Sequence, residues 1–197
     1  MERLSGEAIV FQSSVESLRR MTDGKLSPAC KQELRGLGFD FDKPLLSAYP
    51  LGPWERATEL ILGEMFPLLP LPEARIELGR LFMKGFAETA IGAAAVMFGK
   101  AIGVRRTLSR MTRNMRNGNN YTETEIIEHG PGHIELITRM LPSFLGEWAN
   151  KPSPLGEQFV GVLRAAMELL GAKEAVVKLK AYDPRIRQTS YDVRWRE

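Results

Sequence analysis

The spacing of hydrophobic positions changes along the chain and divides it into a helical part and a mostly extended part. Before residue 120, apolar side chains recur at steps of three and four, which places them on one face of a helix. After residue 120, short segments alternate between apolar and polar side chains, as strands do. The first part predicts a short strand over 8–11, an irregular connector over 40–53, and helices over 13–21, from 28 to 36 or 38, and over 54–66, 73–102 and 105–115.

The second part predicts two hairpins separated by a helix. Their ranges are 121–128 and 134–137 around a turn at 129–132, then a helix over 156–170, then strands over 175–182 and 189–195. Short connections between alternating segments favour antiparallel neighbours. The predicted fold is therefore an α+β domain, with N-terminal helices followed by an antiparallel sheet of at least four strands.

The longest helical pattern, over residues 73–102, carries glycines on its apolar face. Gly85 and Gly92 would each cost about 1 kcal/mol relative to alanine inside a helix. Their presence indicates that something packs close to the backbone there. Close packing of another helix is the simpler interpretation, and a subunit or a ligand is the alternative.

The composition predicts a soluble, cytoplasmic protein. The chain has 197 residues, of which 44% are hydrophobic and 26% charged, with a net charge of +3. Cys30 is the only cysteine, which excludes an intramolecular disulfide and a cysteine-based zinc site. No uncharged run is longer than the eleven residues 89–99, which is short of the roughly 20 apolar residues that a membrane helix needs. We expect residues 1–70 to be a helical extension packed on a core of residues 71–197.

Two resemblances to known families support this fold. The closing unit resembles the C-terminal helix and hairpin of four-vinyl-reductase-type small-molecule-binding domains, and it reads LGEQFVGVLRAAMELLGAKEAVVKLKAYDPRIRQTSYDVRWRE. Those domains share a fold with heme-NO-binding domains and TRAPP trafficking subunits. The stretches LSAYP, EARIELGRLFMKGFAETAIG and RNGNNYTE are similar to a family of uncharacterised paralogous proteins found mainly in myxobacteria. That second resemblance spans nearly the whole chain and implies no established activity.

The resemblance implies a domain that encloses an apolar ligand or forms dimers, but without the usual reactive group. Four-vinyl-reductase-type domains often carry cysteines near the last hairpin, and residues 178–195 contain none. Heme-NO-binding domains use a proximal histidine on a helix, whereas His129 and His133 lie at or beside a hairpin turn. One type of TRAPP subunit has a cysteine that opens onto a lipid-sized channel, and no motif gives Cys30 that role.

No catalytic residue, metal site or cofactor is predicted. His129 and His133 are separated by a glycine-proline turn, so the helical spacing that brings two metal ligands together does not apply. Cys30 has no local motif that would supply a base, which favours an inert helix thiol. Glu123 and Glu125 share a strand face, but exposed strand acids are common. We therefore expect a protein that is not an enzyme.

The strongest charge signal is a basic segment without acids between Glu88 and Glu123. Arg106, Arg110 and Arg113 follow helical steps, so they form a basic stripe, with Leu108, Met111 and Met115 toward the core. Guanidinium groups in a row suit phosphates or carboxylates. A solvated basic helix face, or a complement to acids on a partner helix, is the competing interpretation. Nucleic-acid binding is not favoured, because exposed aromatic side chains and a known motif are missing.

We expect a non-enzymatic small-molecule-binding or sensory domain, dimeric and regulatory, that takes an apolar or anionic ligand. The ligand would lie between the 73–102 helix and the sheet. The residues expected to line or flank that space are Trp54, Arg80, Gly85, Phe86 and Tyr121, with Arg105, Arg106 and Arg110 as an anionic head-group site at its mouth. The ligand could be lipid-like. The alternative is a protein–protein assembly module without a ligand, and an enzyme acting on an anionic substrate has little support.

Overall fold

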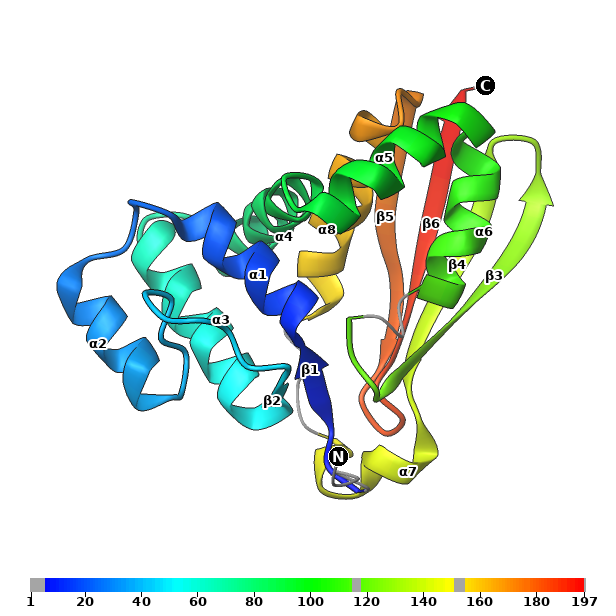
Figure 1. The fold of residues 1–197 in the computed structure, drawn as a ribbon. Helices are drawn as coiled ribbons and strands as arrows, with labels where there is room; N and C mark the ends of the chain where they lie inside the picture. Colours follow the sequence, from blue (N-terminus) through cyan, green and yellow to red (C-terminus); the bar gives the residue numbers. More distant parts are fainter. Residues whose placement is uncertain (1–5, 115–117, 151–154, 197) are drawn as a thin grey trace.

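The computed structural model describes residues 6–114, 118–150 and 155–196, and it joins a helical half to a twisted sheet (Figure 1). The helices are α1 (Gln12–Thr22), α2 (Pro28–Gly36), α3 (Leu51–Met65), α4 (Leu71–Ala87), α5 (Ala90–Ile102), α6 (Val104–Asn114), α7 (Pro142–Leu145), the short 3-10 helix η2 (Gly146–Trp148) and α8 (Leu155–Leu169). The strands are β1 (Ile9–Phe11), β2 (Ala48–Pro50), β3 (Thr122–Gly130), β4 (His133–Met140), β5 (Lys173–Asp183) and β6 (Gln188–Arg196).

The helical half begins with a small antiparallel sheet in which Val10 of β1 lies opposite Tyr49 of β2. β2 falls inside residues 40–53, which the sequence predicted to be irregular throughout. The start of α2 agrees with its prediction, because the Ser27 side chain accepts a hydrogen bond from the backbone N–H of Cys30 at 3.2 Å. Pro28 occupies the first turn, where its missing N–H is not needed.

The main sheet has four antiparallel strands in the order β3-β4-β6-β5, with each hairpin contributing two neighbours. The two hairpins meet where Leu136 of β4 lies opposite Tyr191 of β6. α8 packs on β5 and α6 packs on β3, so both helices cover the same face of the sheet. The predicted α+β class, with helices first and then hairpin, helix and hairpin, is confirmed.

Two hydrophobic cores hold the fold together. The first lies among α1 to α4, and the second lies between the sheet and helices α6 and α8. The first core also takes in Leu78, Tyr121 and Met140, which come from the part of the chain after residue 70. The division at residue 70 therefore does not separate the two cores, and it stays a prediction about domain organisation.

The helix predicted over residues 73–102 is wrong as a single element, because the chain turns by 94° between α4 and α5. Thr89 makes the corner: its hydroxyl donates to the Phe86 carbonyl at 2.8 Å and accepts from the Gly92 N–H at 3.0 Å. A side chain on Gly92 would meet that same Phe86 carbonyl at 1.8 Å, so glycine is required there. Among the described residues no single helix is long and apolar enough to cross a membrane, although bent α4 and α5 together meet that test.

The closest helix contact joins α4 to α8. A Cβ atom added to Gly79 would lie 1.8 Å from the Gln158 carbonyl oxygen, and one added to Gly161 would lie 1.9 Å from the Ile76 carbonyl oxygen. The two backbones therefore touch at a pair of opposed glycines. This contact fixes how the helical half sits on the sheet half.

Candidate functional site

The residues predicted to line a ligand site lie in three separate parts of the fold. Trp54 and Tyr121 belong to the first core. Three others lie on α4: Arg80, Gly85 and Phe86. The last three lie on α6: Arg105, Arg106 and Arg110. None of them lines either of the two hollows described below.

Trp54 and Tyr121 are structural members of the first core. The Trp54 ring lies 6.2 Å from the ring of Phe39 and edge-on to Phe82 at 6.4 Å. Tyr121 is buried, and its burial raises the pKa of the phenol well above the usual value. The nearby Glu55 carboxylate raises this pKa further. Tyr121 is therefore a neutral, packed phenol.

Among the three residues on α4, Gly85 serves helix packing. A Cβ atom on Gly85 would lie 2.5 Å from the Ser17 carbonyl oxygen of α1, which agrees with the simpler interpretation of this glycine. The Arg80 guanidinium lies 3.6 Å from the Glu77 carboxylate, one helical turn away. The space expected for a ligand, between α4 and the sheet, is occupied by α8, whose Leu163 and Met167 are fully buried in the second core.

α5 exposes a continuous apolar surface. The exposed fractions are 66% for Ile91, 72% for Met97 and 49% for Phe98, and the alanines between them are exposed as well. On this helix only the two glycines are buried, and Gly99 packs against Leu170 and Thr107. Large apolar side chains that gather on one exposed helix mark an interaction surface in soluble proteins.

α6 places basic side chains beside this surface. Arg105 forms an ion pair with Glu128 of β3, and the hydrogen bond from Arg105 lowers the pKa of that carboxyl. Arg106 and Arg110 are exposed, and the Arg110 guanidinium lies over the Phe98 ring at 4.9 Å. Arg105 thus ties α6 to the sheet, whereas Arg110, a member of the predicted basic stripe, contacts α5. The side chains of Met111 and Arg113, and residue Met115, lie outside what the structure describes.

We call the exposed surface of α5 with Arg106 and Arg110 the α5–α6 face. Among the described residues, neither arginine nor Lys100 has an acidic partner within ion-pair distance. In Figure 1 both helices lie in the upper part of the view, with α5 along its upper edge. The face therefore combines apolar surface with unneutralised positive charge.

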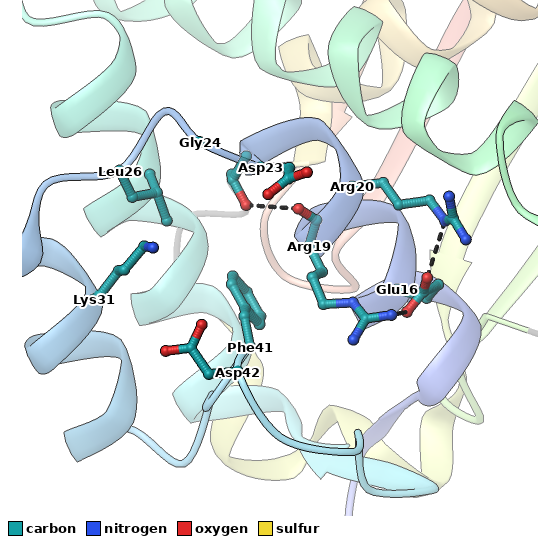
Figure 2. Close-up of a pocket in the computed structure, with 10 residues that line it drawn as sticks. Glu16, Arg19, Arg20, Asp23, Gly24, Leu26, Lys31, Phe41 and Asp42 are labelled. Carbon is teal, nitrogen blue, oxygen red and sulfur yellow. Dashed lines mark hydrogen bonds and ion pairs between the residues drawn. The ribbon is translucent and has the colours of Figure 1, made fainter.

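One surface hollow lies between α1 and the start of α2, and Figure 2 shows it. Its volume is about 280 Å³, and Leu26 and Phe41 form its apolar part. Charged groups of both signs surround it: Arg19, which lies 2.6 Å from Glu16, as well as Lys31, Asp23 and Asp42. Because the signs alternate, this hollow favours neither an anion nor a cation.

The second hollow, of about 510 Å³, lies beside Pro50, Phe144 and Trp148 and is also open to solvent. Behind it, the Arg187 guanidinium lies 5.3 Å from the Trp148 ring and donates to the Glu55 carboxylate at 2.8 Å. Only 4% of the Arg187 side chain is exposed. This buried ion pair connects α3 to the turn between β5 and β6.

The two histidines lie on the sheet face that α6 and α8 leave open. His133 Nε2 lies 2.7 Å from Asp192, His129 Nε2 lies 3.5 Å from Glu135, and the two rings are 4.8 Å apart. Glu135 also accepts a hydrogen bond from Lys180 at 2.5 Å. Within the described parts of the chain, no group of three or more metal-binding side chains is suitably placed.

The Lys180–Glu135 pair should make stability depend on pH. The hydrogen bond from Lys180 lowers the pKa of Glu135 in the folded state. Its stabilisation is therefore present above the unfolded carboxyl pKa of about 4.3 and is lost as pH falls through the lower folded value. Lys180→Met should reduce the free energy of unfolding at neutral pH by at most about 1 kcal/mol, because the pair is partly exposed. Urea unfolding at neutral and acidic pH measures this contribution, with Lys178→Met as the control. A loss of stability in Lys180→Met that does not depend on pH would contradict the prediction.

Sequence comparison assigns the chain to a family. The profile described as "Protein of unknown function (DUF2378)" matches residues 8–196. The chain belongs to the DUF2378 family. The predicted membership of a family of uncharacterised proteins is thereby confirmed. A search among curated proteins gave no match.

The fold of this DUF2378 chain is similar to that of H-NOX domains. A double mutant of the Tt H-NOX domain gives a TM-score of 0.65 at 12% identity, covering 94% of this chain and 92% of that one. A single mutant of the T. tengcongensis H-NOX domain gives 0.62 at 12% identity, covering 93% and 96%. An oxygen-binding H-NOX domain related to soluble guanylate cyclases gives 0.55 at 13% identity, covering 94% and 92%. The predicted heme-NO-binding-like fold is confirmed.

The described residues do not fit a heme. Heme iron in proteins is held by histidine, cysteine, methionine or tyrosine. Neither hollow is lined by any of these side chains. The histidines lie against carboxylates on the open face of the sheet, and Cys30 is buried in the first core, where desolvation raises the pKa of its thiol. The DUF2378 chain thus shares the H-NOX fold without placing an axial ligand on either of these hollows.

Sequence reasoning missed three features of the DUF2378 structure. Arg187 and Glu55 are 132 positions apart, so no local pattern could pair them. Gly161 carries the same signal as Gly85, a glycine inside an apolar helix. The exposure of α5 runs against its uncharged segment over residues 89–99, which favours burial because a helix without polar positions has no face suited to water.

Proposed function

We propose that this DUF2378 domain is a cytoplasmic, non-enzymatic sensory or regulatory domain that acts by binding at the α5–α6 face. One observation carries the proposal: α5 exposes Ile91, Met97 and Phe98 beside guanidinium groups that no described acid neutralises. Such a face recognises a group that is apolar and negatively charged, because both parts gain from the contact. This matches the predicted head-group role of Arg106 and Arg110 but moves the apolar part from an internal cavity to the surface.

The shared H-NOX fold supports a sensory role by analogy, since unrelated functions also share folds. The similar structures include an oxygen-binding H-NOX domain, and others are described by the distortion of their heme. In this chain the apolar and basic side chains of the α5–α6 face lie on the protein surface. The proposed domain therefore responds to the binding of a partner at α5, rather than to a gas bound to heme iron.

The chemistry of the other reactive groups supports a role without catalysis. Cys30 is held as a thiol by burial, which disfavours the nucleophilic thiolate. The alternative predicted from the sequence, an assembly module, would cover the same face with a second copy or another protein. The assembly module and the proposed ligand-binding domain would therefore use the same surface and differ only in what binds to it.

The proposal is tested with anilinonaphthalene sulfonate, a small probe that is both apolar and anionic. The native protein should bind it saturably, and Met97→Glu should weaken binding about tenfold or more, because it places an acid in the apolar surface. Met97 is 72% exposed, so its replacement should leave the thermal midpoint nearly unchanged.

Leu68→Glu is the matched control. Leu68 is 94% exposed in the loop between α3 and α4, away from the α5–α6 face. The same apolar-to-acid change there should leave probe binding intact. Near-ultraviolet circular dichroism verifies that the probe reports on a folded protein. Equal probe binding by native protein and Met97→Glu would disprove the proposed function.

A further inference from the structure

We infer that the α5–α6 face binds an anionic lipid bilayer, with α5 lying in the plane of the membrane surface. This inference rests on the proposed function and names the partner of that face. It follows from three properties of the described residues: the length of α5, the distribution of its apolar side chains, and the charges around it.

The length and composition of α5 suit a helix that lies flat on a membrane. Its 13 residues extend over about 20 Å at 1.5 Å per residue, which is less than the roughly 30 Å of a hydrocarbon core. Exposed apolar residues occur on every turn from Ala90 to Ala101. The whole outer side of the helix is thus available to a continuous apolar medium, as in helices that bury one face at the lipid interface.

The charges lie where lipid head groups would meet them. Lys100 is at the end of α5, and Arg106 and Arg110 are one turn apart on α6. Arg110 stacks on Phe98, so its charge lies at the edge of the apolar surface and can reach phosphate while Phe98 contacts acyl chains. The chain contains no acid from residue 89 to residue 122. Glu128 of β3, which lies beside α6, is paired with Arg105, so α5 and α6 themselves carry no acid that an anionic bilayer would repel.

A second copy of the chain fits this face less well. Symmetric pairing would bring two sets of the same cations together. The acids that each copy offers beside the face are Glu88, at the corner before α5, and Glu128, which Arg105 already pairs with. A protein partner of any kind needs shape complementarity around anchoring side chains. The middle of the face is a convex helix rich in alanine, which offers no pocket for an anchor. A fluid bilayer requires no such match.

The test is co-sedimentation of the full chain with vesicles, either phosphatidylcholine alone or phosphatidylcholine mixed with phosphatidylglycerol. Native protein should bind the mixed vesicles and not the neutral ones, and added salt should weaken binding. Arg106→Glu combined with Arg110→Glu should lower the partition coefficient about tenfold or more, and so should Met97→Glu. Two controls should bind as the native protein does: Leu68→Glu, and the double reversal Lys173→Glu with Lys178→Glu on β5.

Phe98→Trp gives a second measurement, because the native tryptophans Trp54, Trp148 and Trp195 lie in or beside the two cores. Its emission should shift to the blue with mixed vesicles and stay unchanged with neutral ones. Equal binding to both vesicle types, no binding, or a dimer that Met97→Glu dissociates in light scattering would overturn the membrane inference. If the protein does not bind the vesicles while Met97→Glu still weakens binding of the sulfonate probe, the proposed function stands and only its partner is wrong.

Discussion

Gly161→Ala should lower the free energy of unfolding by about 3 kcal/mol, at the upper end of the usual effect of overpacking. The new methyl group would lie 1.9 Å from the Ile76 carbonyl oxygen and 2.8 Å from the Arg80 backbone nitrogen. Both contacts are with backbone atoms, so no side-chain rotation can relieve them, and α8 must move away from α4. For a chain of this size the thermal midpoint should fall by about 6–12 °C.

Gly63→Ala is the matched control for this change. Gly63 also lies inside a helix, but an added Cβ atom would meet nothing within 4 Å. There the same replacement should stabilise the protein by up to about 1 kcal/mol, because alanine favours the helix. Opposite signs at the two positions, measured by urea unfolding, would assign the effect at Gly161 to the helix crossing. A stabilising Gly161→Ala would contradict it.

Gly79→Ala provides a test of coupling across the same crossing. Its methyl group would lie 1.8 Å from the Gln158 carbonyl oxygen, so this variant should be destabilised by a similar amount. Once one alanine has separated the helices, the second meets less resistance. The double variant should therefore lose clearly less than the sum of the single losses, as expected for residues in contact.

Most of the secondary structure could be predicted because its signals are local. Ser27 before Pro28 marks the start of α2, and the alternating segments after residue 120 mark the strands of the sheet. The corner at Thr89 could not be predicted from periodicity alone. Steps of three and four continue from α4 into α5, since a bend of 94° does not interrupt the count. The signal that was overlooked is Thr89 itself, a good N-cap residue three positions before Gly92.

The candidate site was harder to predict, because hydrophobic periodicity reports which side chains share a face and not what covers that face. Gly85 and Arg80 were assigned to a ligand space that α8 fills. Arg106 and Arg110 were correctly placed on a basic helix face, but the apolar surface beside them belongs to α5, whose direction depends on the corner at Thr89. The ligand space expected between α4 and the sheet thus depended on reading α4 and α5 as one straight helix, and the site itself stays a prediction.

Arg187→Met should destabilise the protein by about 3 kcal/mol, the lower end of the range for removing one partner of a buried ion pair. The Arg187 side chain is 4% exposed, donates to Glu55 at 2.8 Å and stacks on Trp148. Methionine keeps most of the packing volume while removing the guanidinium, so the loss should reflect the charge more than a cavity. Chemical unfolding followed by far-ultraviolet circular dichroism measures it.

Arg185→Met is the matched control, two positions away on the same turn. Arg185 also pairs with an acid, Asp183 at 2.9 Å, but its side chain is 80% exposed, so its loss should change stability by less than about 0.5 kcal/mol. Adding Glu55→Gln to Arg187→Met should recover part of the loss, because the carboxylate left facing the buried site is then neutral. Equal effects at Arg185 and Arg187 would show that the pair does not hold α3 to the β5–β6 turn. A large loss at Arg187 alone, partly recovered in the double variant, would establish that this ion pair, hidden from sequence patterns, fastens the helical half to the end of the sheet.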